Sequence, residues 1–408
     1  MIDYYETKTH PITKKMVLEA YKKVKSNGGS AGVDQQSLEC YAKDLKGNLY
    51  KLWNRMTSGS YFPTAVREVI IPKKSGGERS LGIPTINDRI AQEVVKSYLE
   101  PKVDHNFHRD SFGYRQGKNA HQALEIAKSR CRRYDWVIDM DIKGFFDNID
   151  HELVMKALAV YTKEKWVVMY AERWLKMGVM RDGKISEREK GTPQGGVISP
   201  LLANIFMHFV FDKWMERQFP SLRFERYCDD VIVHCRSQKE ASFVKWKITT
   251  RLKECKLELN EEKTHTVYCR DLNRREKHKQ VSFDFLGYTF RPRLHNTKDG
   301  LLLRYGPCMS IKAKTAVVDK LRSLRIHRLK VTIEELSELL NPMLRGWVNY
   351  YCTFNKWSTK ALWMLLNDRL VKWLKNRRKF NRKRAFRWLK VVYKMRPNLF
   401  AHWQIAHP

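Results

Sequence analysis

Two adjacent aspartates stand between β-type residues in the stretch Tyr227-Cys228-Asp229-Asp230-Val231. Two more branched residues follow it, and Phe224 precedes it at strand-like spacing. Because aspartate tolerates turn geometry, the pair suits the tip of a β-hairpin. A solvated turn and a pair of catalytic carboxylates would both produce this pattern. The stretch therefore predicts a hairpin and leaves its role open.

A second acidic segment begins with the apolar run Trp136-Val137-Ile138 and continues as Asp139-Met140-Asp141, which predicts a buried strand ending in acid. If this strand lay beside the hairpin, Asp141 would face Asp229. Such carboxylates suit Mg²⁺, which prefers oxygen ligands and binds one or two carboxylates together with substrate phosphates. Two such ions about 3.5–4 Å apart can activate a primer 3′-hydroxyl and stabilise the leaving pyrophosphate. Asp139 shares a strand face with Asp141, and Asp147 follows nearby, so spacing alone does not choose among these three.

The composition indicates a large folded protein with a polyanionic partner. The 408 residues include 78 Lys and Arg against 44 Asp and Glu, a net charge of +34, and 43% are hydrophobic. This apolar content excludes a disordered basic tail, and the length predicts two to four structural units at roughly 100–200 residues each. We find no uninterrupted apolar run of about 18 residues and no signal peptide, so no membrane partner is expected.

The eight cysteines, at positions 40, 131, 228, 235, 255, 269, 308 and 352, are scattered along the chain with no Cys-x-x-Cys pair. Neither a disulfide framework nor a structural zinc site is therefore indicated. We expect reduced thiols in a cytoplasmic protein.

Residues from about 60 to 295 alternate between short β-type runs and helical segments, which predicts an α/β layout. The predicted strands are Val66–Pro72, Trp136–Asp141, Val231–His234 and Val281–Phe290. Gly76-Gly77 separates the first strand from another β-type run and reads as a hairpin tip. A helix is predicted over Val197–Phe209.

Residues 309–375 have helical periodicity instead. Apolar residues recur at three- and four-residue spacing over Ile311–Leu324, Ile333–Leu340 and Lys356–Leu374. Val331-Thr332 and a predicted break at Asn341-Pro342 separate the three segments. Three such helices could pack as a small bundle.

The C-terminal part carries more than half of the positive excess. Residues 296–408 hold 25 Lys and Arg and 6 Asp and Glu, an excess of 19 positive charges, and no acidic residue follows Asp368. The densest run contains Arg377, Arg378, Lys379, Arg382, Lys383 and Arg384. Trp373, Phe380, Phe386 and Trp388 are interleaved with these charges. A solvated helix face is the simpler explanation, but aromatic and cationic residues mixed in this way favour contact with nucleic acid.

Eight segments, taken in order, are similar to those of the group II intron-encoded reverse transcriptase/maturase family, with the Tyr-Cys-Asp-Asp stretch among them. The others are Pro72–Pro84, Ser111–His121, Asp141–His151, Gly191–Asn204, Leu259–Thr264 with Phe285–Tyr288, and Leu344–Tyr351. The resemblance covers nearly the whole chain. Because no Cys-x-x-Cys with a His-Asn-His nuclease pattern follows the basic run, the chain resembles the shorter members that lack the endonuclease domain.

This resemblance implies an α/β (α+β) right-hand polymerase fold, with an antiparallel sheet and helices in the palm and an all-helical thumb, known as domain X. The expected divisions are an N-terminal extension over residues 1–60, fingers and palm over 61–295, the thumb over 296–375 and a basic DNA- or RNA-binding segment over 376–408.

The resemblance also assigns catalytic roles. Asp141, Asp229 and Asp230 would be the catalytic aspartates, and the Ile142 carbonyl would be a further ligand to two Mg²⁺ ions, for which Mn²⁺ could substitute. The family usually has alanine where Cys228 stands. Cysteine is small enough for the same space, so we expect activity to survive, with altered fidelity or sensitivity to oxidation.

Five further residues would contact the nucleotide. Lys73 and Arg79 would grip the incoming triphosphate, although a solvated hairpin also explains them. Phe146 would exclude a ribose 2′-hydroxyl, unless it or neighbouring Phe145 is simply a core residue. Gln194 would lie near the templating pair or merely begin a helix. Lys263 would protonate the pyrophosphate or be an ordinary surface lysine.

The implied function is RNA-directed DNA polymerase activity combined with binding of group II intron RNA as a maturase in splicing and retrohoming. The partners would be this intron RNA, an RNA template, a DNA primer, target DNA and dNTPs, in the bacterial cytosol or nucleoid. Two alternatives stay open. One is a free-standing enzyme used in DNA repair or phage defence, and the other is a non-catalytic RNA-binding splicing factor.

Overall fold

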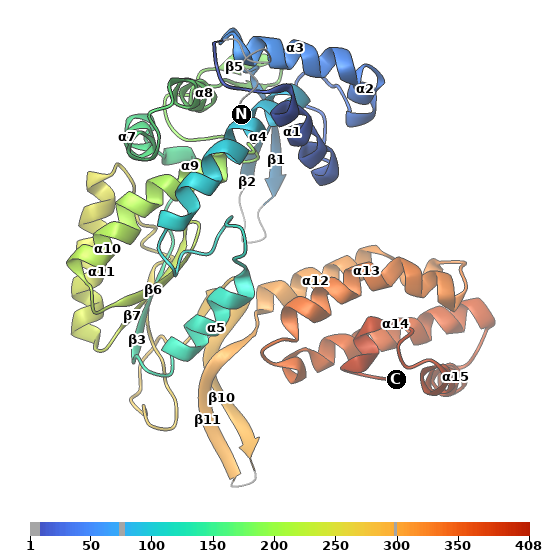
Figure 1. Ribbon diagram of the computed structural model, residues 1–408. Coiled ribbons are helices and arrows are strands. Elements are labelled where there is room, and N and C mark those ends of the chain that lie inside the picture. Colours follow the sequence, from blue (N-terminus) through green and yellow to red (C-terminus); the bar gives the residue numbers. More distant parts are fainter. Residues whose placement is uncertain (1–8, 73–77, 298–299) are drawn as a thin grey trace. The chain divides into compact units, whose positions relative to one another are not determined.

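The computed structural model describes residues 9–72, 78–297 and 300–408 (Figure 1). The chain divides into two compact units, each made of several segments. The first unit comprises residues 1–119, 138–233 and 239–264, and the second comprises residues 120–137, 234–238 and 265–408.

Three helices open the first unit, α1 (Lys14–Asn27), α2 (Leu38–Lys43) and α3 (Leu45–Thr57), and a fourth, α4 (Ile86–Val103), comes after the first two strands. Each helix begins with an N-cap whose side-chain oxygen accepts a hydrogen bond from a backbone N–H of the first turn. The N-cap residues are Thr13, Ser37, Asp44 and Thr85, respectively. Such N-caps satisfy backbone donors that the helix itself cannot. The buried residues of α1 recur at three- and four-residue spacing, and this face packs against α4.

The first unit also contains a four-stranded sheet, in the order β2-β1-β4-β5. Strands β1 (Val66–Pro72) and β2 (Glu78–Ile83) pair antiparallel, and β1 pairs parallel with β4 (Val179–Arg181), which pairs with β5 (Lys184–Ser186). The predicted strand Val66–Pro72 is therefore confirmed. The predicted tip at Gly76-Gly77 lies outside the described residues.

A second four-stranded sheet has the order β6-β7-β3-β8. Its strands are β6 (Arg223–Tyr227), β7 (Asp230–Cys235), β3 (Trp136–Met140) and β8 (His265–Tyr268). Two of the predicted strands are thus confirmed, and they are neighbours in the sheet.

Helices precede and follow the strands of this sheet along the chain (Figure 1). They are α6 (Phe145–Asn148), α7 (His151–Tyr161), α8 (Lys165–Leu175), α9 (Ser199–Met207), the π-helical turn η3 (His208–Asp212), α10 (Lys213–Gln218) and α11 (Gln238–Glu254), and the short η2 (Asp104–Asn106) follows α4. The helix predicted from Val197 is therefore present as α9. It continues through the π-helical turn, which brings Asp212 into the interior.

The second unit contains α5 (Ala120–Arg130) and a three-stranded sheet of order β11-β10-β9. Its strands are β9 (Phe283–Phe285), β10 (Tyr288–Thr297) and β11 (Gly300–Met309). The prediction of one strand over Val281–Phe290 is wrong. Leu286 and Gly287 adopt left-handed φ values of 49° and 78°, so the chain reverses there and forms an antiparallel hairpin.

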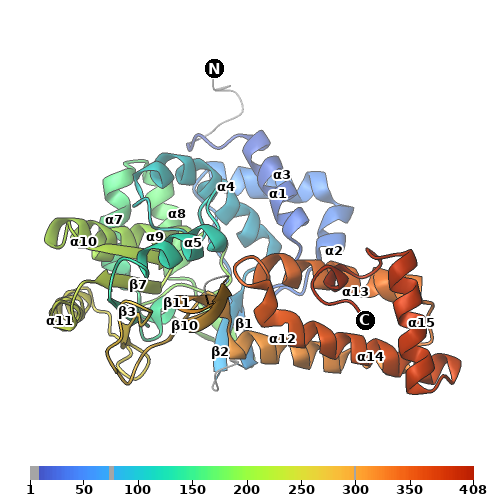
Figure 2. The same ribbon diagram turned by 90° about the horizontal axis from the view of Figure 1, so that it is seen from below.

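From Ile311 onward the chain forms helices joined by short turns (Figure 2). The all-helical thumb expected from residue 296 therefore begins later, because β10 and β11 extend to Met309. The helices are α12 (Ile311–Ser323), η4 (Ile326–Arg328), α13 (Ile333–Tyr351), η5 (Lys356–Thr359), α14 (Lys360–Arg378), α15 (Arg382–Met395) and η6 (Ala401–Gln404). The predicted helix from Lys356 is thus a 3₁₀ turn followed by α14.

The predicted break at Asn341-Pro342 is also wrong, because α13 runs through it. Pro342 lies on the exposed face, where a missing backbone donor can be replaced by water. On the opposite face, Leu336, Leu340 and Leu344 are fully buried. Asn341 also joins the helix to the C-terminal segment, because its amide donates to the carbonyl of Leu399 at 2.9 Å and accepts from the N–H of Ala401 at 3.0 Å.

These helices share one core. Buried residues of α13 and α14 pack together with Ala385, Leu389 and Val392 of α15 and with Phe400 and Trp403 beyond it. The basic segment after residue 376 is therefore folded onto the same core as the helices before it.

None of the eight cysteines forms a disulfide. Within the described ranges, no helix is both long enough and apolar enough to span a lipid bilayer.

Candidate active site

The two adjacent aspartates lie where β6 turns into β7. Cys228 and Asp229 connect the two strands, and Cys228 adopts a left-handed φ of 62°. The Cys228 side chain is 3% exposed, and the pKa of its thiol is raised well above the ordinary value by burial and by the charge of Asp229. A buried, protonated thiol is unreactive, so the structure argues against the expected sensitivity to oxidation.

Strand β3 lies next to β7, and this neighbour relationship brings Asp141 toward the hairpin. Burial raises the pKa of Asp229, and the negative charge of Asp141 raises it further. Asp230 begins β7 at the surface, yet the surrounding protein and the charges of Asp229 and Asp141 raise its pKa to about 7. Three carboxylates thus interact through their charges, as the sequence hypothesis requires of Asp141, Asp229 and Asp230.

The segment 258–264 runs beside Asp141 and Ile142. The N–H of Asp141 donates to Oγ1 of Thr264 at 3.3 Å, and its carbonyl accepts from the N–H of Asn260 at 2.8 Å. Ile142 is buried and forms a β-bridge with Leu259. Nζ of Lys263 lies 3.8 Å from Oδ2 of Asp141, with the lysine side chain 58% exposed. The structure therefore brings Lys263 to the carboxylates and leaves its amine open to solvent.

Of the two residues proposed to grip a triphosphate, the structure describes one. Arg79 lies exposed on β2, and its positive charge lowers the pKa of both Asp229 and Asp230 against the larger effect of burial. Lys73 lies outside the described residues.

The loop 191–198 joins β2 to the segment after Asp141. The N–H of Gly82 in β2 donates to the carbonyl of Gln194 at 2.8 Å, and the N–H of Thr192 donates to the carbonyl of Phe146 at 2.8 Å. At Gly191, with φ 79°, a Cβ atom would lie 2.7 Å from the Phe146 carbonyl, so only glycine fits. These backbone hydrogen bonds of the loop therefore fix the positions of Gln194 and Phe146.

The structure distinguishes Phe145 from Phe146. Phe145 is 2% exposed and packs against Phe206 at a ring distance of 6.5 Å. Phe146 is only partly buried and contacts Phe145 edge to face. Phe145 is therefore the core residue, and Phe146 is the one whose ring is partly open.

Sequence reasoning missed Gln92, which organises the start of α9. Its Oε1 accepts hydrogen bonds from the N–H groups of Val197 at 2.7 Å and Ile198 at 3.3 Å, although the side chain is 1% exposed. A glutamine in the middle of α4 gives no local signal of a partner so distant in the sequence.

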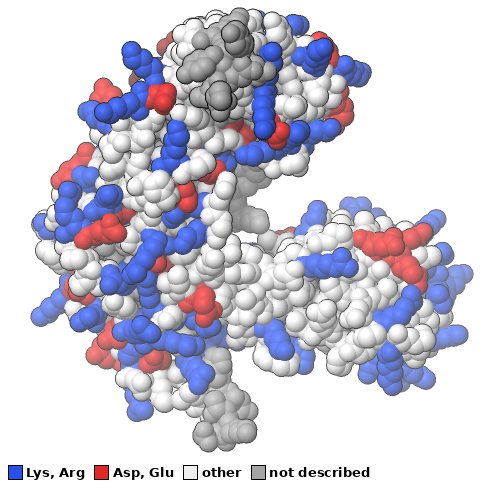
Figure 3. All heavy atoms as spheres, in the orientation of Figure 1, with Lys and Arg blue, Asp and Glu red and all other residues white. Residues whose placement is uncertain are grey.

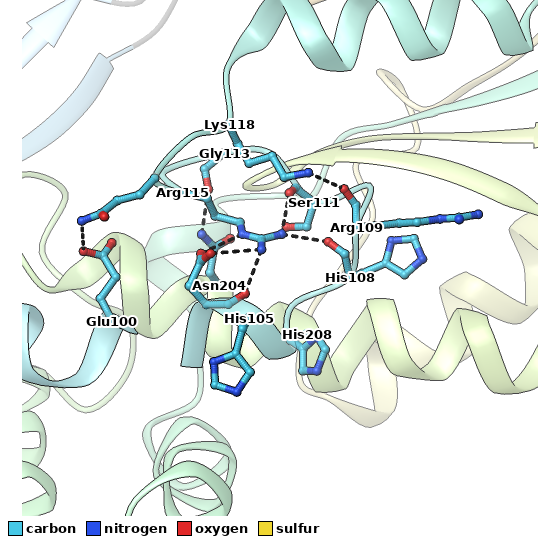
Figure 4. A network of polar contacts seen from close by, with 12 residues as sticks. Glu100, His105, His108, Arg109, Ser111, Gly113, Arg115, Lys118, Asn204 and His208 are labelled. Atoms are coloured by element: carbon cyan, nitrogen blue, oxygen red, sulfur yellow. Dashed lines mark hydrogen bonds and ion pairs between the residues drawn. The ribbon is translucent and has the colours of Figure 1, made fainter. Parts of the chain in front are cut away.

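Residues of the segment 104–118 take part in a network of polar contacts (Figure 4). Arg115 donates to Oδ1 of Asp104 and to the carbonyls of His108 and Ser111, each at 2.8 Å. The amide of Asn204 donates to the carbonyl of Gly113 at 2.8 Å. Asn204 therefore holds the Gly113 carbonyl, next to the turn that carries the aspartates.

The basic residues named from the sequence lie around the junction of α14 and α15. Arg377 and Arg378 end α14, Lys379 adopts a left-handed φ of 50°, and Arg382, Lys383 and Arg384 form the first turn of α15. Arg378 lies 4.7 Å over the ring of Trp388, and Arg384 lies 4.6 Å over Phe380. On the face drawn in Figure 3, Lys and Arg gather over this end of the second unit.

The carboxylates offer hard oxygen donors, as Mg²⁺ requires. Within the described part of the chain, no three His, Cys, Asp or Glu side chains form a ready-made metal cage. Mg²⁺ needs no such cage, because it keeps several waters and binds substrate phosphates. The mutual repulsion that raises the pKa of Asp230 is also what a bound cation would relieve. The donor set therefore fits a divalent ion.

Two family profiles match the chain. That of the reverse transcriptase (RNA-dependent DNA polymerase) family matches residues 71–290, and that of the group II intron maturase-specific domain matches residues 314–393.

Individual proteins are also similar. The group II intron-encoded protein LtrA of Lactococcus lactis is 26% identical over 81% of this chain and 68% of its own length. Protein YkfC of Escherichia coli is 34% identical over 47% of this chain and 51% of its own. Among solved structures, telomerase from Candida albicans aligns with a TM-score of 0.48 at 13% identity, covering 90% of this chain and 67% of that one.

Proposed function

The chain belongs to the reverse transcriptase family and carries a group II intron maturase-specific domain, and from this premise we propose that its acidic hairpin extends a DNA primer along an RNA template. The observation that carries this proposal is the interaction of three carboxylates at one point. Desolvation by the surrounding protein and the like charges of Asp229 and Asp141 raise the pKa of Asp230 to about 7. Carboxyl groups whose pKa is shifted in this way are concentrated at functional sites.

Divalent ions held by Asp141, Asp229, Asp230 and the Ile142 carbonyl, Mg²⁺ or in its place Mn²⁺, would supply Lewis-acid activation of the primer hydroxyl and charge neutralisation on the pyrophosphate. The protein's part is to hold the carboxylates in place. Hydrogen bonds from Asp141 and Asn260 lock the backbone of this segment to residues 260–264. The turn between β6 and β7 holds the backbone of Asp229 and Asp230 in place.

Other residues act on the incoming dNTP. Arg79, whose charge already acts on Asp229 and Asp230, would donate to the triphosphate, and so would Lys73. Phe146 would present its ring to the sugar and thereby disfavour a 2′-hydroxyl, while Gln194 on the adjoining loop would lie near the templating pair. Lys263 would donate a proton to the departing pyrophosphate oxygen, since its amine lies near Asp141 and is open to solvent.

We further propose that the helical end of the second unit binds intron RNA and target DNA. α15 begins with Arg382, Lys383 and Arg384, although the positive end of a helix dipole disfavours cations there. A phosphate at this point would satisfy both the three side chains and the helix end. The aromatic rings of Phe380 and Trp388 beside these charges suit stacking with nucleobases.

We propose the same division of the chain into parts as the sequence predicts. We assign residues 1–60 to an N-terminal extension, 61–295 to fingers and palm, 296–375 to the thumb and 376–408 to the basic nucleic-acid-binding segment. The two family matches, over 71–290 and 314–393, fall mainly within the central two assignments, and the second continues into the basic segment.

Primer extension tests the polymerase proposal. The purified chain is given an RNA template, an annealed DNA primer, Mg²⁺ and dNTPs, and we expect full-length cDNA. A chain that binds the template–primer but adds no nucleotide, where a control enzyme does, would instead be a splicing factor without polymerase activity.

A further inference from the structure

A fully buried ion pair lies beneath the turn that carries Asp229 and Asp230. Nε and one terminal nitrogen of Arg226 donate to the two carboxylate oxygens of Asp212, both at 2.7 Å. Both side chains are 0% exposed. Arg226 holds the pKa of Asp212 below its ordinary value, against the opposing effect of burial. The pair is thus bidentate and charged.

The remaining terminal nitrogen of Arg226 reaches the turn itself. It donates to the carbonyl of Cys228 at 3.0 Å and to Oδ1 of Asn204 at 3.0 Å. The amide of the same Asn204 donates to the carbonyl of Gly113 at 2.8 Å. One guanidinium therefore links η3, α9 and the catalytic turn, and through Asn204 it also holds Gly113.

The backbone of Arg226 is also hydrogen-bonded to the segment that contains Gly113. Its N–H donates to the carbonyl of Asp110 at 2.9 Å, and its carbonyl accepts from the N–H of Phe112 at 2.8 Å. The segment 110–113 is therefore fastened to β6 by main chain and side chain together.

The turn needs such support, because its conformation is unfavourable by itself. A non-glycine residue with left-handed φ, such as Cys228 at 62°, persists where its surroundings over-determine it. Gly113 packs closely against the backbone of Cys228, because a Cβ added at residue 113 would lie 2.5 Å from the Cys228 nitrogen. The Cys228 carbonyl is held by Arg226 on one side of the turn, and its nitrogen meets Gly113 on the other.

We propose that Arg226 is a positioning residue for polymerisation, which holds the Cys228 turn in its left-handed form and thereby sets where Asp229 and Asp230 stand relative to Asp141. This inference rests on the proposed polymerase function. Stability alone is a weak reason for the pair, since replacing a buried ion pair with apolar residues is often neutral or stabilising. The hydrogen bond to Cys228 is the part that no apolar pair can supply.

The test separates these two roles with three variants of the full chain. Arg226→Lys keeps the charge but loses the planar fork. The double variant Asp212→Leu/Arg226→Met replaces the pair by an apolar contact. Arg173→Lys is the matched control, because Arg173 also holds two backbone carbonyls, of Gly59 and Tyr61, at 2.8 and 2.5 Å, and neither belongs to the turn.

Three quantities are measured for each variant: kcat and KM for dNTP in primer extension, the melting temperature, and amide hydrogen exchange of peptides covering 110–114 and 226–231. We expect Arg226→Lys and the double variant to lower kcat about 100-fold, as misplacement by about 1 Å does, with KM changed less than about threefold. Exchange should rise in those two peptides only. The double variant should keep its melting temperature, and Arg173→Lys should keep its kcat.

Wild-type kcat in the double variant would overturn the inference, and so would a loss of kcat that follows the melting temperature equally in all three variants. If the wild type makes no cDNA, the polymerase proposal fails, but the exchange experiment still reports whether Arg226 holds the turn. Unchanged exchange in 226–231 would then refute the positioning role by itself.

Discussion

Gly113 lies directly against Cys228: a Cβ atom at residue 113 would come within 2.5 Å of the Cys228 backbone nitrogen and 2.9 Å of the Tyr227 carbonyl carbon. The obstructing atoms are backbone, which cannot rotate away as a side chain can. The acidic turn therefore requires the smallest residue behind it.

This close approach predicts the effect of Gly113→Ala. The added methyl group must displace the turn, so we expect kcat in primer extension to fall at least about tenfold while RNA binding is retained. Gly306→Ala is the control, because a Cβ there meets no atom within 4 Å. Equal activity of Gly113→Ala and Gly306→Ala would show that the close approach has no functional consequence.

The second prediction concerns the pH dependence of the Mg²⁺ requirement. Desolvation by the surrounding protein and the charges of Asp229 and Asp141 raise the pKa of Asp230 to about 7, so the carboxyl is increasingly protonated as the pH falls below 7. A proton and a divalent ion compete for it, so the Mg²⁺ concentration for half-maximal extension should rise about five- to tenfold from pH 7 to pH 6 and change little above pH 8. A titration that gives the same requirement at pH 6 and pH 8 would contradict the shifted carboxyl.

The third prediction concerns stability of the helical core in the second unit. His402 is fully buried, its Nε2 lies 2.8 Å from Oδ1 of Asn367, and burial lowers its pKa to about 3. It is therefore neutral when folded and takes up a proton below about pH 6.5 when unfolded. The free energy of unfolding is then fully retained above about pH 6.5 and falls by about 1.4 kcal/mol per pH unit as the pH decreases toward 3.

Calorimetry of wild type and His402→Gln at pH 7 and pH 5 checks this effect. Glutamine can still donate to Asn367 but does not titrate. The wild type should lose about 2 kcal/mol more than the variant between these pH values. If both proteins lost the same free energy of unfolding, a group other than His402 would cause the sensitivity to acid.

The fourth prediction concerns the basic turn of α15. Replacing Arg382, Lys383 and Arg384 by Gln should make RNA binding less dependent on salt. The slope of log affinity against log salt should become smaller by about 2, because each neutralised phosphate of a single strand contributes about 0.7 to it. Replacing Lys239, Lys247 and Lys253 of α11 removes the same charge from another place and should change the slope less. Equal changes would mean that total charge, rather than this turn, governs binding.

Much of the site was predictable because its signals are local. The hairpin aspartates, the strand that ends before Asp141 and the helix from Val197 each lie within a few residues of their own apolar pattern. That Asp141 lies near the hairpin aspartates could be predicted only from the family resemblance, and the sheet order shows it. Spacing alone left Asp139 and Asp141 equivalent.

The wrong predictions have physical reasons. Pro342 signals a helix end, but burial of Leu336, Leu340 and Leu344 on the other face outweighs the cost of one missing donor. The Leu286-Gly287 turn divides an apolar run because leucine there adopts a conformation that sequence statistics disfavour. Arg226 and Asp212 pair through a π-helical turn, and no pattern in the chain signals that a charged residue beside the aspartates is fully buried.

The catalytic role of the hairpin carboxylates is tested most directly by primer extension with wild type and with Asp229→Asn/Asp230→Asn on the same RNA template, with RNA binding measured in parallel. We expect cDNA from the wild type and none from the double variant, with RNA affinity nearly unchanged. Equal loss of RNA binding and synthesis would mean that the acids hold the fold, and synthesis by the double variant would contradict the central claim that these carboxylates carry the chemistry.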